Sequence, residues 1–154
     1  MKLSMNLSLS EVLVSQTAKR LQISNEPTKE HLNNLKQIAN NIFQPLRDGL
    51  GYPIYVSSGY RSEALNKAIK GSSKTSQHMK GQALDLDADV YKGVTNKDIF
   101  LFIRDNLDFD QLIWEYGTIN SPAWVHVSFF EGKNRGKVMR CYGKSQYTLF
   151  DLDV

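Results

Sequence analysis

One segment of the sequence, SSKTSQHMKGQALDLDAD (residues 72–89), combines a histidine with three aspartates. The alternation in ALDLDA is typical of a half-buried strand, so its leucines should face a core while Asp85 and Asp87 face a cleft. His78 precedes this strand in a polar loop. The segment is therefore either a solvated acidic turn or one part of a metal site whose other part lies elsewhere in the chain.

A second segment, WVHVSFF, contains another histidine that could complete a metal site. In WVHVSFF the same alternation places His126 on one strand face with Trp124. The preceding run, FDQLIWE, ends in Glu115, and a short turn-rich link joins the two. Two such runs predict an antiparallel hairpin, which would bring Glu115 close to His126.

These residue types suit a hydrolytic metal centre. Two imidazoles and one carboxylate are a sufficient protein shell for a catalytic zinc, which keeps a fourth position for water, and His78, Asp85 and His126 could supply them. A carboxylate that is not a ligand can take the proton of a metal-bound water as it attacks a carbonyl, and Glu115 is the candidate. Arg61, just past the strand YVSSGY, could supply positive charge for a developing oxyanion or a substrate carboxylate.

Taken singly, the same residues have structural explanations. An isolated histidine on a strand more often has a structural or surface role, and His31, on a polar helix face, is assigned that role. Trp124 alone is more often a core residue, and Arg61 could pair with Glu63. Cys141 has no histidine nearby in the sequence, so we interpret it as a small buried strand residue and not as a nucleophile.

Composition narrows the class of protein. The chain has 154 residues, 41% hydrophobic and 23% charged, which predicts a single globular domain over residues 1–154. Its net charge of +3 is mild, which disfavours a nucleic-acid binder. The basic segment GKNRGKVMR is interpreted as a solvated turn, although a basic face would also suit an anionic polymer such as a cell wall. Cys141, the one cysteine, excludes an internal disulfide and a four-cysteine metal site.

No targeting or membrane segment is predicted. The N-terminal sequence MKLSMNLSLSEVLVSQTAKR lacks the uninterrupted apolar run of a signal peptide, and no later window approaches the length of a membrane span. We therefore expect synthesis in the cytoplasm, with release by another factor for any role outside the cell. A single core accounts for the apolar residues, so a monomer is expected.

Helices dominate the first part of the chain. A first helix is expected from Ser8 or Ser10 to about Arg20, and a second begins after SNEPTKE, where Asn25 and Pro27 occupy starting positions. Pro45 should kink or shorten the last turn of the second helix. Residues 1–50 thus form a helical cover, and residues 51–150 the core that carries the site. Two further helices are expected, SEALNKAIKG with its Ser62 cap and NKDIFLFIRDNL with its Thr95 cap.

Strands dominate the second part. PIYVSSGYR, GQALDLDA, FDQLIWE, WVHVSFF and KVMRCY each have the composition or alternation of a strand. Helices followed by a mostly antiparallel sheet predict an α+β fold.

Four segments in this order, SSGYRS, SQHMKGQALDLD, FDQLIWE and WVHVSF, resemble the M15 family of zinc peptidases, which holds D-Ala-D-Ala carboxypeptidases and L-Ala-D-Glu endopeptidases. The resemblance covers about Tyr55 to Phe129, and its patterns S-x-H, G-x-A-x-D and W-V-H are specific. It implies the Hedgehog/DD-peptidase-like fold and one Zn²⁺ per chain on His78, Asp85 and His126. The helices up to about Leu50 lie outside it and are expected to cover the sheet.

The resemblance also suggests roles for neighbouring residues. Arg61 matches the motif arginine, and Ser76 matches a position that helps to hold the substrate. Trp124 and Tyr60, beside His126 and Arg61 in the sequence, are further candidates for substrate binding.

The general acid or base departs from the family pattern. Many members carry it three residues before the last histidine, where this chain has Ala123. In the Hedgehog domain a glutamate lies on the preceding strand, in a stretch that resembles FDQLIWE and matches Glu115. Either the base has been lost or Glu115 supplies it, and we expect Glu115.

The implied function is zinc-dependent hydrolysis of peptide bonds in peptidoglycan stem peptides, by exo or endo action. A phage or prophage lysin that acts on the cell wall after release is one setting, and a cytoplasmic dipeptidase acting on wall-precursor dipeptides is another. The alternative from a different class is a catalytically inactive, zinc-stabilised module that binds cell wall or protein. A nucleic-acid binder rests only on the modest positive charge.

Overall fold

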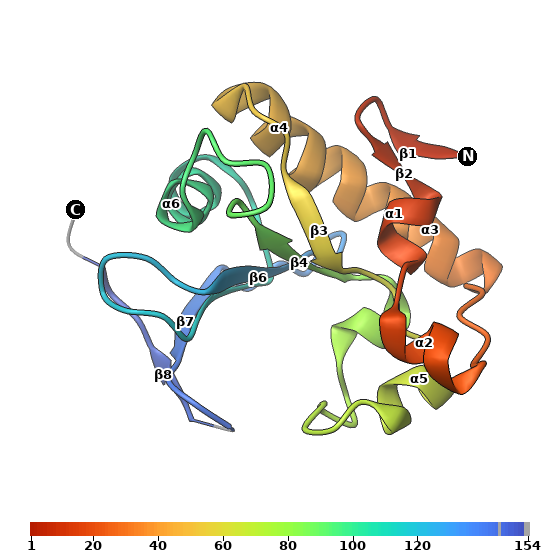
Figure 1. Cartoon of the computed structure of the whole chain (residues 1–154). Helices are drawn as coiled ribbons and strands as arrows, with labels where there is room; N and C mark the ends of the chain where they lie inside the picture. Colours follow the sequence, from red (N-terminus) through yellow and green to blue (C-terminus); the bar gives the residue numbers. More distant parts are fainter. Residues whose placement is uncertain (145, 153–154) are drawn as a thin grey trace.

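A six-stranded sheet forms the frame of the protein, with strand order β3-β4-β6-β5-β7-β8 (Figure 1). The computed structural model describes residues 1–144 and 146–152. All neighbouring strands are antiparallel except β5 and β7, which are parallel. The strands are β3 (Tyr55–Ser58), β4 (Ala83–Asp87), β5 (Gln111–Glu115), β6 (Trp124–Ser128), β7 (Lys137–Cys141) and β8 (Tyr147–Leu149). The predicted α+β class with a mostly antiparallel sheet is confirmed.

Helical elements precede β3 and also lie between the first strands of the sheet, with α5 and η2 between β3 and β4 and α6 between β4 and β5. In the view of Figure 1, α4 and α6 lie above the sheet, whereas α2 and α5 lie below it. A two-stranded hairpin, β1 (Lys2–Ser4) with β2 (Leu7–Ser8), begins the chain. The helical elements are α1 (Leu9–Leu13), α2 (Gln16–Leu21), α3 (Lys29–Ile38), the π-helix η1 (Ala39–Phe43), α4 (Gln44–Leu50), α5 (Glu63–Ala68), the 3-10 helix η2 (Gln77–Lys80) and α6 (Asn96–Asn106). Within residues 1–144 and 146–152, no helix has the length and apolarity needed to cross a bilayer.

The apolar face of the sheet packs under the helices. On β4, Leu84 and Leu86 are fully buried, and on β6 the same holds for Val125 and Val127. These residues join one hydrophobic cluster with the buried faces of α3, η1, α4 and α6. The alternating residues, including Asp85 and His126, therefore project from the opposite face of the sheet.

Two details of the helical part correct the sequence-based predictions. The helix predicted up to Arg20 is interrupted, because Val14 is extended and the Ser15 side chain accepts from Ala18 N to begin α2. Thr28 caps α3 by accepting from His31 N, whereas the Asn25 amide bonds to backbone carbonyls elsewhere. These local bonds compete with the continuous helix that was expected from Ser8 or Ser10 to Arg20.

Pro45 does not shorten the second helix. The backbone N–H of Gln44 bonds to Ala39 O, five residues back, so a π-helical turn precedes the proline. Pro45 then lies in the first turn of α4, where its fixed φ suits the helical backbone. The helix therefore runs on to Leu50.

Gly81, which follows η2, lets α3 pack closely against the chain between η2 and β4. Gly81 has φ of +72°, and a Cβ there would lie 2.5 Å from His31 O. The combined left-handed strain and overpacking predict that Gly81→Ala lowers the free energy of unfolding by about 2–4 kcal/mol. Urea denaturation would measure the loss.

Gly132 provides the matched control for this substitution. Its φ is +80°, but apart from Gly132 and its two chain neighbours no atom of residues 1–144 or 146–152 lies within 4 Å of a Cβ placed there. Gly132→Ala should therefore cost only the conformational strain, about 1–2 kcal/mol. Equal losses at the two positions would show that the contact between a Cβ at position 81 and His31 O adds no steric cost.

Candidate metal centre

Three side chains converge on the open face of the sheet: His78, Asp85 and His126, called here the metal triad. Asp85 Oδ1 lies 3.0 Å from His126 Nδ1 and 3.4 Å from His78 Nε2. One potential ligand atom from each residue lies within 4.8 Å of those of the other two. The arrangement predicted from the sequence is therefore present in the structure.

The sheet register places two members of the triad opposite each other. Asp85 on β4 and His126 on β6 are direct cross-strand partners. Side chains of such partners lie on the same face, about 4.5–5.5 Å apart at their Cβ atoms. The pairing of β4 with β6 therefore sets the distance between these two ligands.

The third member comes from a short helical turn. His78 lies in η2, which Ser76 caps by accepting a hydrogen bond from His78 N at 3.2 Å. Gly81 ends the turn in the left-handed conformation and leads into β4. The patterns S-x-H and G-x-A-x-D thus have a local structural reason: a cap before the ligand and a glycine after it.

A main-chain oxygen fixes the ring of His78. Gly59 O, at the end of β3, lies 2.6 Å from His78 Nδ1. A carbonyl only accepts, so Nδ1 carries the proton, and in the neutral ring Nε2 presents a lone pair towards Asp85. This is the outer-shell bond that orients a metal-binding histidine.

Burial and charge favour the metal-binding protonation states. Burial lowers the pKa of His78 below its ordinary value, although Asp85 opposes this shift, so the neutral imidazole is favoured. Burial alone would raise the pKa of Asp85, but interactions with His78 and His126 hold it far below its ordinary value. A neutral imidazole and an ionised carboxylate are the forms that bind a cation.

The triad fits a divalent metal ion. The His78 Nε2 lone pair and the Asp85 carboxylate face each other, an arrangement of two acceptors that a cation between them would satisfy. Ligand atoms bonded to one tetrahedral zinc at 2.0–2.1 Å lie about 3.3–3.4 Å apart, close to the separations from Asp85 Oδ1. The two nitrogens and one oxygen are also ligands that zinc accepts. The triad could therefore hold a metal ion.

Glu115 lies on the same face, one row of the sheet away. Its cross-strand partner is Trp124, two residues before His126, and its neighbour Ile113 faces His126 directly. The residue is 7% exposed, and burial raises the pKa of its carboxyl, an effect that His126 opposes. Ala123 is exposed, outside the lining of the cleft. Of the two positions considered for a base, only Glu115 therefore lies in the cleft.

Arg61 and Ser76 form a second polar pair beside the triad. Arg61 Nη2 donates to Ser76 Oγ at 3.4 Å, and burial lowers the pKa of this guanidinium while Asp85 opposes the shift. Arginine nevertheless keeps its charge in proteins. Within the described residues, the buried Arg61 Nε has no hydrogen-bond partner. The pair thus presents a fixed cation and an unused donor beside the triad.

A cleft of about 1170 Å³ contains the triad, Glu115 and Arg61. The segment GKNRGKVMR, interpreted from the sequence as a solvated turn, contributes Lys133 and Arg135 to its wall, and Lys70 and Lys80 add two more cations. The interpretation of that segment was therefore incomplete, because the fold of the chain brings it to the site.

The other two candidates for substrate binding lie in different places. Trp124 lines the cleft and packs near Tyr116, with ring centroids 5.2 Å apart. Tyr60 is buried, is not part of the cleft lining, and its hydroxyl lies 3.0 Å from His31 Nδ1. The structure therefore brings Trp124 to the triad but not Tyr60.

A buried carboxylate that the sequence analysis did not single out anchors the cleft wall. Asp110 is 3% exposed and accepts from Arg135 Nε at 2.8 Å, Arg135 Nη2 at 2.9 Å and Gln77 Nε2 at 3.0 Å. The bonds from Arg135 are the main reason that the pKa of Asp110 lies below its ordinary value. Since Gln77 precedes His78, this network ties the loop after β6 to the turn that carries a triad residue.

Asp110→Asn tests this network. A depressed pKa in the folded state stabilises the fold above the ordinary aspartate range, and that stability is lost as the pH falls through the folded pKa. We expect the variant to lose about 1–3 kcal/mol at neutral pH and to show a shallower loss of stability on acidification. Denaturation from pH 7 down to pH 3 would measure both effects. Unchanged acid sensitivity would show that Asp110 does not couple folding to pH.

A mostly antiparallel sheet with a His–Asp–His triad on its open face defines a metal-binding hydrolase of the metallopeptidase class. The profile of the Peptidase M15 family matches residues 5–128, and the chain belongs to that family. No individually curated protein matches the chain. The match begins at residue 5, so the helices before Leu50, which lie outside the motif resemblance, are part of the family region.

Proposed function

We propose that the protein is a zinc-dependent peptidase that hydrolyses peptide bonds in peptidoglycan stem peptides. The observation that carries this proposal is the position of Glu115, buried on the same sheet face as the triad and one row away. A structural zinc site is usually closed by four protein ligands, whereas the triad supplies three. The spare position and the adjacent carboxylate together favour an enzyme over a binding module.

Each residue has a defined task. His78, Asp85 and His126 would hold zinc, which when bound supplies a Lewis acid and an acidified water. Glu115, whose pKa burial raises, accepts a proton as the peptide carbonyl is attacked and returns it to the leaving amine. Arg61 balances the negative charge that develops on the substrate, and Ser76 helps to hold its guanidinium in place.

The cleft wall supports an anionic peptide as substrate. Lys70, Lys80, Lys133 and Arg135 line the cleft that holds the triad, and peptidoglycan stems carry free carboxylates. Trp124 and Tyr116 add an aromatic surface for the apolar parts of the peptide. The protein would act as a monomer on wall peptides or wall-precursor dipeptides, with no nucleic-acid or membrane partner.

The test is product identification. Zinc-loaded protein would be incubated with purified peptidoglycan fragments, and the products analysed by mass spectrometry beside Glu115→Gln and His126→Ala variants. A defined product that is absent with both variants is expected, and its mass would identify the bond and separate exo from endo cleavage. If fragments of several wall types remained intact while one zinc stayed bound per chain, the binding-module alternative would replace the peptidase.

A further inference from the structure

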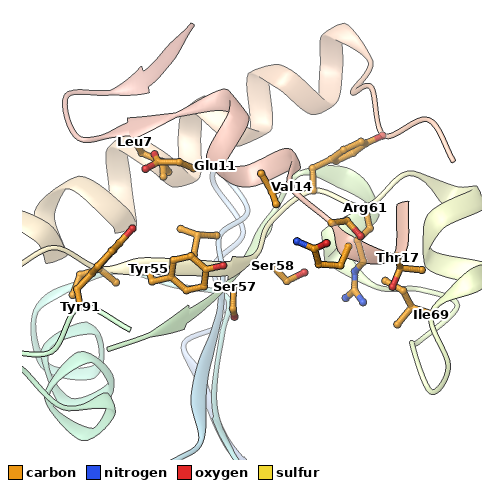
Figure 2. A pocket seen from close by; sticks show the side chains of 15 residues that line it. Leu7, Glu11, Val14, Thr17, Tyr55, Ser57, Ser58, Arg61, Ile69 and Tyr91 are labelled. Carbon is orange, nitrogen blue, oxygen red and sulfur yellow. The ribbon is translucent and has the colours of Figure 1, made fainter. Parts of the chain in front are cut away.

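A second cavity, of about 420 Å³, lies on the opposite side of β3 from β4 (Figure 2). Figure 2 shows it as a groove between the chain around α1 and strand β3, with Leu7, Glu11 and Val14 on one wall. Ser57 and Ser58 lie on the other wall. Its volume falls within the usual range of small-ligand sites. We call it the β3 groove.

The groove exposes a strand edge. β3 is the first strand in the sheet order, so only one of its sides pairs with another strand. In the part of the chain that the structure describes, the backbone of residues 54–58 makes no hydrogen bond outside its pairing with β4. Pairing to α1 begins only beyond the strand, where Tyr60 N donates to Val12 O at 2.7 Å. An edge of this kind accepts an extended peptide as an additional strand.

Gly59 keeps this groove narrow at one end. A Cβ at Gly59 would lie 2.6 Å from Val12 O, so only glycine lets α1 pack this close to the end of β3. The wall formed by α1 thus stands at a fixed distance from the strand edge. The width of the groove at this end is therefore set by the packing of α1 against the end of β3.

The β3 groove and the metal cleft share part of their lining. Arg61 and Ile69 line both cavities. Ser58, on the groove wall, is the cross-strand partner of the triad residue Asp85. A peptide that follows the edge of β3 would therefore reach the triad after passing Arg61.

The groove walls suit a peptide. Apolar side chains such as Val14 and Ile69 alternate with polar ones. Gln16 and Thr17, which also line it, make no side-chain hydrogen bond within the described residues. Tyr55 and Tyr91 pack edge to face, with ring centroids 5.9 Å apart, at the end of the groove away from Arg61. These walls can contact both side chains and backbone of an extended segment.

We propose that the β3 groove binds an extended segment of the substrate peptide as an added strand along β3, while the scissile bond lies at the triad. This proposal rests on the peptidase function proposed above and extends it. It implies that the enzyme prefers peptides that extend several residues beyond the cleaved bond over dipeptides.

The first test uses peptide length. In the zinc-loaded native protein, KM should fall about tenfold between a substrate that fills only the metal cleft and one extended by four residues, about 1.4 kcal/mol of binding. Methylation of successive backbone nitrogens in the extension should raise KM at alternate positions, because only every second residue of an added strand bonds to β3. A glycan fragment that competes for the groove, or a KM independent of length and methylation, would overturn the proposal.

A groove variant provides the second test. Val14 is 50% exposed, so Val14→Trp should fill the groove without disturbing the core, and Lys19→Trp adds the same ring at an exposed position on α2 outside the groove lining. Val14→Trp should raise KM about tenfold for the long peptide only, and Lys19→Trp should change neither. If the native protein cleaved the short peptide but Val14→Trp left the KM of the long peptide unchanged, the groove proposal would be rejected and the peptidase proposal would stand. Cleavage of neither peptide by the native protein would reject the peptidase itself.

A binding measurement separates the groove from turnover. In zinc-loaded Glu115→Gln, addition of the long peptide should slow hydrogen exchange of the backbone amides in residues 54–58. The short peptide should leave these amides unchanged. Equal exchange with both peptides would contradict pairing along β3 even if the long peptide bound tightly.

Discussion

Glu115→Gln is expected to reduce kcat by about 10²–10⁴-fold and to leave bound zinc at one per chain. The substitution keeps the size of the side chain and its place beside Trp124 on β6, but it removes the group that accepts the proton. Zinc content by mass spectrometry and kcat with a defined stem peptide would check both parts. The effect belongs to the chemical step because Glu115 is not a member of the metal triad.

The pH dependence of kcat/KM in the same variant tests the direction of the Glu115 pKa shift. Burial raises the pKa of Glu115, so the acid limb of kcat/KM in the native protein should lie above the pH expected for an ordinary glutamate. Glu115→Gln should lose that limb, whereas Glu131→Gln, at an exposed position, should retain it together with native activity. Native turnover in Glu115→Gln would remove this residue from the mechanism.

His126→Ala is expected to abolish both zinc binding and hydrolysis. Loss of an outer-shell partner typically costs 10–100-fold in metal affinity, so loss of a ligand should cost more than about 100-fold. Calorimetric titration of the zinc-free variant would measure the affinity. The expected loss of activity follows from the loss of metal and not from unfolding, which circular dichroism would verify.

The remaining histidine supplies the matched control. The chain has three histidines, and His31 contacts the Tyr60 hydroxyl and does not line the metal cleft. His31→Ala should bind one zinc with native affinity. Zinc binding that survives in His126→Ala, or is lost in His31→Ala, would contradict the assignment of the triad.

Alternation along single strands made much of the site predictable. Because side chains of a strand alternate between faces, the burial of Leu84 and Leu86 requires Asp85 to face the other way. The hairpin of β5 and β6 placed Glu115 near His126 for the same local reason. These features depend on residues that are close together in the sequence, and alternation within a strand predicts the direction of such residues.

Other parts of the site depend on contacts between distant segments. The Asp110 network joins Gln77 and Arg135, which are far apart in the chain. Gln77 and Asp110 lie within SQHMKGQALDLD and FDQLIWE, but neither pattern indicates that these residues contact each other. The parallel pairing of β5 with β7 likewise follows from the path of the chain and not from the composition of either strand. The hairpin of β1 and β2 is too short for alternation to be visible.

The bond between His78 and Gly59 O has a consequence for how the site can vary over generations. Where a carboxylate side chain orients a metal-binding histidine, a single codon change can delete it. Here the acceptor is part of the main chain, so every residue type at position 59 would still carry it. Selection at position 59 therefore acts on the space beside Val12, which has no room for a side chain. A mutation at this position can change the orientation of His78 only if it displaces the backbone.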